Sequence, residues 1–359
     1  MMSARDQCTE IPDRMRALRI QRLGLLSRTQ SLLELDQIPT PRPGSGEVLI
    51  HVHYCGVCHT ELDEIEGRTP PVSLPMTPGH QIIGTVVAEG PDCSRRLIGA
   101  KVGVAWIHSA CGDCEFCRRG LENLCPDFSA CGRDAPGGYA DYLVADEPFV
   151  YPLPAQLDLE SAAPLLCAGA VGYRALKLCD LDNGASLGLT GFGASGQLVL
   201  QIARHRFPDS PVFVFARSEK ERAIAEQMGA AWTGDTQESP PTSLRAIIDT
   251  TPAWLPVLCA LDALEPGGRL VVNAIRKESG DQDKLTNLDY ARQLWMEKSL
   301  TSVANVTRKD VSEMLDLAAS GSLEPRVTPY PLEQAEEALL AIRSGDIRAA
   351  GVLHISNPD

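Results

Sequence analysis

The sequence contains neither a long run of apolar residues nor an excess of basic ones. Without an apolar stretch of about 20 residues, no helix is expected to span a membrane. Residues 1–22 carry scattered charges and lack the apolar core of an export signal, so a cytoplasmic location is expected, with residues 1–14 as an extension before the first strand. With 33 Lys and Arg against 47 Asp and Glu, the formal net charge is −14, which disfavours nucleic acid as a partner.

Cysteine, in contrast, is plentiful, and its positions are informative. Twelve cysteines in a chain without an expected export signal indicate a reducing compartment. Four of them form the run Cys111-Gly-Asp-Cys114-Glu-Phe-Cys117, followed after seven residues by Cys125. Four thiolates this close together can surround one tetrahedral Zn²⁺ and leave it no open position, so the run predicts a structural zinc site. A chance cluster or a pair of disulfides is the alternative.

The expected strands and helices divide the chain into about two domains, as its length of 359 residues also suggests. The first part has β-branched runs at 47–54 and 81–89, followed by helices at 157–179 with a turn at 169–172. From residue 186 strands and helices alternate, which predicts a parallel doubly wound sheet. The strands are expected at 186–190, 211–215, 245–249 and 268–273, and the helices at 197–206, 219–228 and 255–264. After them we expect a strand from residue 299, helices at 309–319 and 332–343, and a strand at 351–355 that returns to the first domain.

A glycine-rich turn joins the first of these strands to its helix, with the sequence Gly191-Phe-Gly193-Ala194-Ser195-Gly196. Gly191 would allow the tight turn, Gly193 the close approach of a pyrophosphate, and Gly196 close packing of the helix on the strand. The phosphates would then lie at the N-terminus of the helix. The turn therefore predicts a dinucleotide site, and a purely structural turn is the weaker interpretation.

The residues after the second strand of this unit bear on which dinucleotide binds. An NAD site has Asp or Glu at this place to bind the ribose hydroxyls. Here Ala216 is followed by Arg217, Ser218 and Lys220, which suit the 2′-phosphate of NADP. The alternative is NAD, with Arg217 stacked on the adenine and Lys220 in a solvated helix. We predict NADP.

Three further candidate metal ligands lie far apart in the sequence. They are Cys58 in CGVCHTE at 55–61, His80 in PGHQ at 78–81 and Cys167 in LLCAG at 165–169. Taken alone, Cys167 would more often be a buried core thiol and His80 a loop residue. Their spacing does not join them into one site.

Together the motifs resemble those of a known family. CGVCHTEL at 55–62, PGHQIIG at 78–84, the four-cysteine run, AAPLLCAG at 162–169 and GFGASG at 191–196 follow the order of the zinc-dependent medium-chain alcohol dehydrogenases. The resemblance extends from about Met15 to the C-terminus. It implies an α/β fold, with a GroES-like β-barrel catalytic domain at 15–167 and 304–359 and a doubly wound Rossmann cofactor domain at 168–303. The active site would lie in the cleft between the two domains.

The resemblance also implies roles for individual residues. Cys58, His80 and Cys167 would bind the catalytic zinc and leave a fourth position open. Glu61 would orient the His80 ring. Thr60 would hydrogen-bond the alcohol and begin a proton relay.

At three places the sequence departs from the family pattern. Gln81 follows the ligand histidine where the family usually has Glu, and its neutral amide cannot act as a carboxylate ligand. Asp63 stands where many members have the histidine that ends the relay, so the relay would end at Asp63, at Glu64 or in water. The family's pyrophosphate-binding arginine aligns with Ala350, and Arg348 would replace it unless Arg348 is merely solvated.

Further residues are expected to line the binding sites. His59 would contact the cofactor phosphate, with a surface histidine as the alternative. Trp106 and Ile107 would lie at the lip of the substrate pocket near the metal, although Trp106 could equally belong to the core. Thr69 stands where small-alcohol enzymes often have tryptophan, so the pocket would admit substrates larger than ethanol.

The sequence therefore predicts a zinc-dependent alcohol dehydrogenase or aldehyde reductase, which transfers hydride between a primary alcohol or aldehyde and NADP(H) or NAD(H). Two zinc ions per chain, a small-molecule substrate and a homodimer or homotetramer are expected. A polyol or formaldehyde-type dehydrogenase of the same superfamily is the enzymatic alternative. A non-catalytic, cofactor-binding paralogue is the alternative from another class, and the complete ligand set with Thr60 argues against it.

Overall fold

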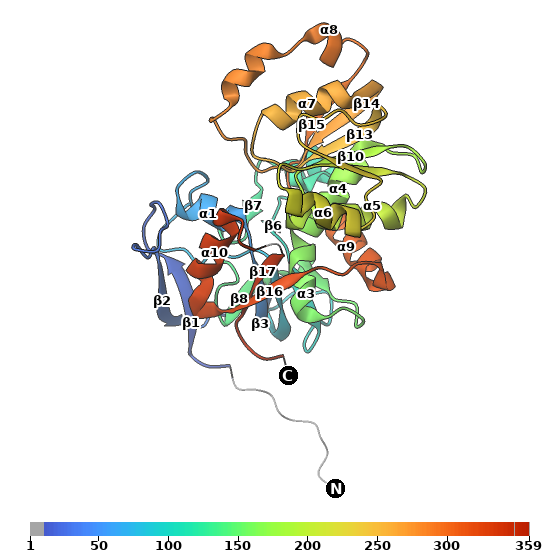
Figure 1. Ribbon diagram of the computed structural model, residues 1–359. Helices are drawn as coiled ribbons and strands as arrows, with labels where there is room; N and C mark the ends of the chain where they lie inside the picture. The colour runs from blue at the N-terminus through green and yellow to red at the C-terminus, as the bar shows by residue number, and fades with distance from the viewer. Residues whose placement is uncertain (1–10, 348, 359) are drawn as a thin grey trace.

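One half of the molecule, the upper part of Figure 1, is built on a parallel sheet. The sheet has six strands in the order β12-β11-β10-β13-β14-β15. The computed structural model describes residues 11–347 and 349–358. The strands of this sheet are β10 (Leu187–Thr190), β11 (Val212–Phe215), β12 (Trp232–Gly234), β13 (Leu244–Asp249), β14 (Leu264–Val272) and β15 (Ser299–Ser302). This order is that of a dinucleotide-binding Rossmann fold, in which strand addition reverses between β10 and β13. The predicted doubly wound sheet is confirmed.

Helices cover both faces of this sheet. They are α4 (Ala168–Cys179), α5 (Ala194–Arg206), α6 (Glu219–Gln227) and α7 (Leu255–Ala263). The short helix α8 (Tyr290–Gln293) packs on α7, and α9 (Arg308–Leu317) packs on α4. Alternation along β11 places Val212 and Val214 in one core with α5, whereas Phe213 and Phe215 pack in a second core with α7. Because both faces are covered at the centre of the sheet, β10 and β11 are buried along their whole length.

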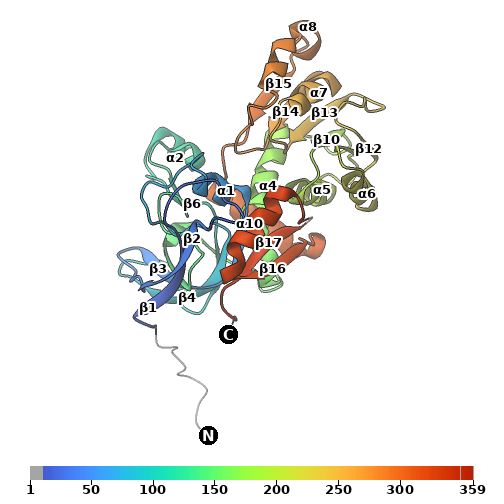
Figure 2. The same cartoon turned by 60° about the vertical axis from the view of Figure 1, so that its left-hand side comes forward.

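The other half is built on a seven-stranded, largely antiparallel sheet (Figure 2). Its path is β16-β17-β3-β4-β5-β9, and β8 also pairs with β3. The strands are β3 (Glu47–Val57), β4 (Ile82–Glu89), β5 (Lys101–Val104), β8 (Tyr142–Asp146), β9 (Val150–Pro152), β16 (Val327–Pro331) and β17 (Ala350–His354). Because β17 pairs with β3, with His354 opposite Tyr54, the end of the chain returns to the first half as expected.

Eight further elements belong to this half. They are β1 (Arg14–Ile20), β2 (Leu33–Pro39), β6 (Ile107–Ser109), β7 (Ser129–Ala130), α1 (His59–Ile65), α2 (Glu115–Arg118), α3 (Leu159–Ala162) and α10 (Ala335–Ser344). β1 and β2 form a hairpin, and β6 pairs with β7. Helix α1 directly follows β3, which places the motif that begins at Cys55 at the end of a long buried strand.

The turn predicted at residues 169–172 is wrong. Helix α4 runs through these residues without a break, and the break lies at Cys167, between the 3₁₀ helix η3 (Ala163–Leu166) and α4. Gly172 serves packing instead: a Cβ atom there would lie 2.6 Å from Cγ2 of Val199, so its absence lets α4 approach α5 closely. The irregular backbone at Cys167, with φ −126° and ψ −85°, sets the direction of its thiol.

The two halves share an apolar core. One buried cluster contains Ile83 of β4, Leu166 of η3, Leu189 of β10 and Val352 of β17. The domain boundaries predicted at 167/168 and 303/304 therefore fall within packed structure and stay a prediction. None of the helices within residues 11–347 and 349–358 combines the length and the apolar character needed to cross a bilayer.

Candidate active site and metal centres

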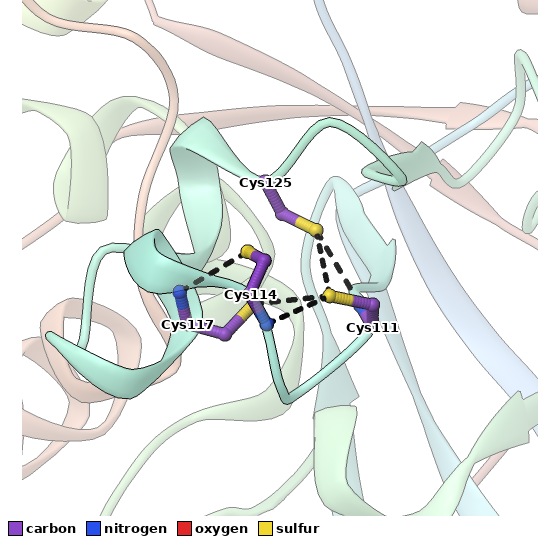
Figure 3. A group of neighbouring side chains, drawn as sticks. All are labelled: Cys111, Cys114, Cys117 and Cys125. Carbon is purple, nitrogen blue, oxygen red and sulfur yellow. Dashed lines mark hydrogen bonds between the residues drawn. The ribbon is translucent and has the colours of Figure 1, made fainter.

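The four cysteines predicted to hold a structural zinc lie together around α2 (Figure 3). Cys111 precedes α2, Cys114 is its N-cap, Cys117 lies within it, and Cys125 follows the 3₁₀ helix η1 (Glu122–Leu124). Their sulfur atoms all lie within 4.8 Å of one another. The Sγ of Cys111 is 3.5 Å from that of Cys125 and 3.9 Å from that of Cys117.

These distances fit a single tetrahedral ion. Four sulfurs, each about 2.3 Å from zinc at tetrahedral angles, lie roughly 3.8 Å apart. The backbone N–H of Cys117 donates to the Sγ of Cys114 at 3.5 Å, and that of Cys114 donates to the Sγ of Cys111 at 3.4 Å. Such bonds favour a thiolate, although a hydrogen bond with the Asp113 side chain raises the pKa of Cys111 to about 12. The bond from Cys117 lowers the pKa of Cys114 to about 7. A metal held by four sulfurs has no position for a substrate, so this site suits a structural zinc.

The three dispersed candidate ligands also meet. Cys58 stands directly before α1, His80 lies in the loop before β4, and Cys167 occupies the break before α4. Their ligand atoms lie within 4.8 Å of one another. His80 is buried, whereas the two cysteines are partly exposed. Two thiolates and one imidazole fit zinc and leave it an open position.

The pKa values of the two thiols in this set shift in opposite directions. A hydrogen bond from the Cys167 thiol lowers the pKa of Cys58 well below that of a free thiol, although burial opposes the shift. The same hydrogen bond, together with burial, raises the pKa of Cys167 well above its ordinary value. These opposite shifts favour the thiolate at Cys58 and the thiol at Cys167, and a metal that binds both sulfurs would displace the thiol proton.

Glu61 connects two of the ligands. Its Oε1 accepts a hydrogen bond from Nδ1 of His80 at 2.5 Å, and its Oε2 accepts one from the backbone N–H of Cys58 at 2.8 Å. Burial alone would lower the pKa of His80, but Glu61 and Cys58 raise it well above its ordinary value. Because Nδ1 is engaged, Nε2 is the nitrogen left for a metal.

The other predicted residues near these ligands have different surroundings. Thr60 is 7% exposed, and its Oγ1 lies 3.6 Å from Sγ of Cys58. His59, the first residue of α1, is exposed. Gln81 is buried and packs against Gly56, where an added Cβ would lie 2.6 Å from Cδ of Gln81. Thr60 therefore lies beside the metal ligands, and Gln81 contributes to the packing of β3 against β4.

The two candidates for the end of the proton relay are both buried in α1. Asp63 accepts hydrogen bonds from Nε of Arg68 at 2.5 Å and from Nε of Arg276 at 3.0 Å. Arg276, which no sequence motif indicated, lies 213 residues away and follows β14 in the other half. Neither carboxylate oxygen of Glu64 has a hydrogen-bond partner among the residues that the structure describes, and burial raises its pKa well above its ordinary value.

The predicted substrate-pocket residues divide between the site and the core. The Trp106 ring lies 6.4 Å from that of His80, measured between centroids. Arg133, which the sequence did not indicate, places its guanidinium 5.5 Å from the Trp106 ring. Thr69 is partly buried and its Oγ1 has no partner in the described part of the chain. Ile107 is fully buried in the shared core, so it belongs to the core and not to the pocket lip.

The glycine turn has the geometry that a dinucleotide site requires. Gly191 has φ +80°, and a Cβ there would lie 2.7 Å from Oγ1 of Thr250. A Cβ at Gly196 would lie 2.7 Å from the carbonyl oxygen of Gly191. At Gly193, the N-cap of α5, no atom lies within 4 Å of an added Cβ. This open space in front of the first N–H groups of α5 fits the phosphates of a nicotinamide cofactor.

The predicted specificity residues follow β11 at the edge of the cofactor site. Ala216 is buried, Arg217 and Lys220 are exposed, and Ser218 is the N-cap of α6. Arg222, which the sequence did not indicate, donates to the carbonyl oxygens of Ala216 and Arg217 at 2.7 and 3.2 Å and thereby holds the turn. The exposed guanidinium and ammonium groups therefore remain available to a ligand.

The predicted phosphate ligand Arg348 lies outside the described residues. Arg326 lines a cavity of about 10 Å³ together with Ala194, the first residue of α5, and Ala350. Arg326 therefore lies close to Ala350, the position that aligns with the family's pyrophosphate-binding arginine.

The fold and the sequence both match known alcohol dehydrogenases. Residues 44–155 match the family model of the alcohol dehydrogenase GroES-like domain. The chain is 38% identical over 331 residues to the probable alcohol dehydrogenase AdhA of Mycobacterium tuberculosis (strain CDC 1551 / Oshkosh), covering 89% of this chain and 93% of the relative. A cobalt- and zinc-bound thermostable alcohol dehydrogenase from Pyrobaculum aerophilum has a TM-score of 0.84 at 25% identity, over 95% of this chain and all of that one (100%). An acetophenone reductase from Geotrichum candidum NBRC 4597 in complex with NAD has a TM-score of 0.81 at 25% identity, over 96% of this chain and 98% of that one. The predicted family and fold class are confirmed: the chain belongs to the zinc-dependent medium-chain alcohol dehydrogenases and has their GroES-like and Rossmann domains.

Proposed function

We propose that this enzyme interconverts primary alcohols and aldehydes, with NADP(H) as its preferred nicotinamide cofactor and two zinc ions per chain. The observation that carries this proposal is the meeting of Cys58, His80 and Cys167 within 4.8 Å, beside the hydroxyl of Thr60. The separate set of four cysteines supports the second, structural zinc. Membership of the alcohol dehydrogenase family supports the reaction type.

The chain's own residues would position the reactants and move the proton. Zinc held by the three ligands would supply Lewis acidity, which lowers the pKa of an alcohol and polarises a carbonyl. The nicotinamide would accept or return the hydride. In oxidation, Thr60 accepts the proton of the alcohol on its Oγ and passes its own proton on toward solvent, and in reduction the order reverses. Glu61 holds the His80 ring in one orientation through Nδ1.

The preference for NADP(H) rests on the residues after β11. Ala216 offers no carboxylate that would repel a 2′-phosphate, and Arg217, Ser218 and Lys220 supply charge and hydrogen-bond donors. Arg217 and Lys220 are exposed and so open to a bound phosphate. NAD(H) is the alternative, since a stacked arginine would leave it fully competent.

The substrate class rests on the pocket residues. Thr69, in place of a tryptophan, leaves room in the pocket for substrates larger than ethanol. Trp106, beside His80, provides an apolar wall. Polyol and formaldehyde-type substrates are the alternatives. A kinetic panel of primary alcohols, aldehydes, polyols and formaldehyde adducts, run with both cofactors, tests the proposal: primary alcohols with NADP(H) should give the highest kcat/KM. A clear preference for polyols would refute the substrate class.

We also propose that the chain forms a homodimer or homotetramer. β15 is an edge strand whose four residues are all exposed. Exposed apolar side chains lie on and before it, at Leu288, Tyr290, Trp295, Met296 and Leu300. An exposed edge with apolar side chains favours pairing with another chain. Light scattering of the purified protein would give the mass, and a monomer would refute this part of the proposal.

A further inference from the structure

An ion pair joins α1, the helix that carries Thr60 and is called the catalytic helix below, to the cofactor half of the molecule. The Nε of Arg276 lies 3.0 Å from both carboxylate oxygens of Asp63. Asp63 belongs to α1, and Arg276 belongs to the loop that follows β14. The Asp63 side chain is 1% exposed and that of Arg276 30%, so water screens this pair far less than a pair on the open surface.

The loop that carries Arg276 is itself anchored to the Rossmann sheet. The ammonium group of the next residue, Lys277, pairs with Asp249 at the end of β13 and donates to the carbonyl oxygens of Thr251 and Ala253 at 2.7 and 3.0 Å. The Lys277 side chain is 9% exposed. Neighbouring residues thus reach in different directions, Lys277 to the sheet and Arg276 to α1. A movement of the loop with α1 would therefore have to break the contacts of Lys277 with Asp249, Thr251 and Ala253.

Both ends of this connection lie where the reactants are expected. Asp63 stands one helical turn after Thr60, in the same helix, and that helix directly follows the ligand Cys58. β13 neighbours β10, and a dinucleotide binds in such a sheet at the carboxyl ends of the strands beside this switch point. Two ion pairs, Lys277–Asp249 and Arg276–Asp63, therefore connect the cofactor edge of the sheet to the helix that carries Thr60.

We propose that Arg276 is a positioning residue that, through Asp63, fixes the catalytic helix at a set distance from the cofactor-binding sheet. The proposal rests on the dehydrogenase function proposed above. Asp63 is then an anchor rather than the last acceptor of a proton relay, because Oδ1 receives hydrogen bonds from Arg68 and Arg276 and Oδ2 a further one from Arg276. The proton from Thr60 reaches solvent by another route.

The pairing of Asp63 with two arginines provides a matched control. Arg276→Gln and Arg68→Gln each remove one cation from the same carboxylate, but Arg68 lies in the same segment as Asp63 and does not link it to the cofactor half. We expect Arg276→Gln to lower kcat by about 10- to 100-fold, the scale of a small misplacement of the reacting groups. Its Kd for NADP(H), measured by NADPH fluorescence, should stay within about threefold, because the glycine turn and Arg217 lie on the sheet side of the pair.

The control and the conservative variant complete the kinetic test. Arg68→Gln should keep kcat within about threefold of the wild type, and Arg276→Lys should recover part of the loss because lysine keeps the charge. A kcat within threefold of the wild type in Arg276→Gln would overturn the proposal. An equal loss in Arg68→Gln would overturn it as well, since the carboxylate alone would then be responsible.

Amide hydrogen exchange tests the connection without any turnover. Arg276→Gln should speed exchange by roughly tenfold or more both in residues 59–65 and in residues 273–278, whereas Arg68→Gln should leave residues 273–278 unchanged. Unchanged exchange in both segments of Arg276→Gln would overturn the proposal. A wild-type protein that oxidises no alcohol would instead refute the proposed function, and it would leave the exchange result interpretable.

Discussion

Nδ1 of His80 donates a 2.5 Å hydrogen bond to the carboxylate of Glu61, and neither side chain is more than 1% exposed. The second oxygen of Glu61 accepts the backbone N–H of Cys58, so one carboxylate holds two of the three metal ligands. This follows from the sequence, because Glu61 lies three residues after Cys58, in the first turn of α1. The side chain can therefore reach both the start of the helix and the loop that carries His80.

Loss of this carboxylate should weaken zinc binding at the catalytic site. We expect Glu61→Gln to lower zinc affinity by about 10- to 100-fold, because the ring of His80 loses the partner that fixes its tautomer and orientation. Competition with a chelator measures this. The matched control is Glu147→Gln, since Glu147 is also buried but binds Ser94 and Arg95 instead of a metal ligand. An equal loss of zinc in both variants would contradict the role of Glu61.

Replacement of Thr60 tests the first step of proton transfer. Thr60→Ala keeps all zinc ligands but removes the hydroxyl that lies 3.6 Å from Sγ of Cys58. We expect kcat to fall about 10²-fold or more, the scale of a lost acid–base step, and Thr60→Ser to retain most of the activity. Steady-state kinetics at neutral pH measures both. Equal activity of Thr60→Ala and the wild type would remove Thr60 from the mechanism.

Cofactor preference should reverse when charge is exchanged at the end of β11. The double variant Ala216→Asp with Arg217→Ile introduces repulsion toward a 2′-phosphate and removes attraction at the same time. We expect the wild type to favour NADP(H) in kcat/KM and the double variant to favour NAD(H). Parallel kinetics with both cofactors measures the preference. If the wild type prefers NAD(H), Arg217 stacks on the adenine instead of binding phosphate.

The contact between α9 and α4 should lose its contribution to stability in acid. Asp310 caps α9 together with Thr307 and pairs with Arg174 and Lys177 of α4 at 2.7 and 2.9 Å. Burial alone would raise the pKa of Asp310, but hydrogen bonds from Lys177, Thr307 and Arg174 outweigh it and lower the pKa below 3.8. A lowered pKa stabilises the fold above the unfolded-state value, and the effect disappears as pH falls through the folded-state pKa.

The corresponding variant is Asp310→Asn. We expect it to lower the free energy of unfolding by about 3 kcal/mol near pH 7, because two cations lose a buried partner. The difference from the wild type should stay constant down to about pH 5 and shrink below about pH 4. Denaturant unfolding at these pH values gives the difference. A difference that grows toward acid would mean that the carboxylate is not what stabilises the contact.

Local sequence signals predicted the parts of the site that are formed by one segment. The cysteines from 111 to 125 and the glycines from 191 to 196 each lie within a short stretch, so their spacing alone indicated a ligand. Cys58, His80 and Cys167 come from three separate segments, and only the family resemblance joined them. The turn expected at 169–172 was wrong because glycine is also used where two helices approach closely, as Gly172 and Val199 do.

Contacts between distant side chains could not be predicted from the sequence. Arg276 and Asp63 are 213 residues apart. The family resemblance drew attention to Asp63, but Arg276 would pass as an ordinary solvated charge in its own segment. Arg133 beside Trp106 depends in the same way on how the chain folds back. No sequence motif marks Arg276 or Arg133, because the role of each depends on a partner that is distant in the sequence and not on its neighbours in the chain.

The metal content and turnover of Cys167→Ala test the central claim most directly. The wild type should contain about two zinc ions per chain, and Cys167→Ala about one, with turnover abolished and the fold retained. Cys114→Ala should instead lower stability or solubility, because a metal bound at a closed site is coupled to folding. Elemental analysis together with an alcohol-oxidation assay gives both quantities. A Cys167→Ala protein that keeps two zinc ions and its turnover would contradict the assignment of Cys58, His80 and Cys167 as the catalytic zinc site.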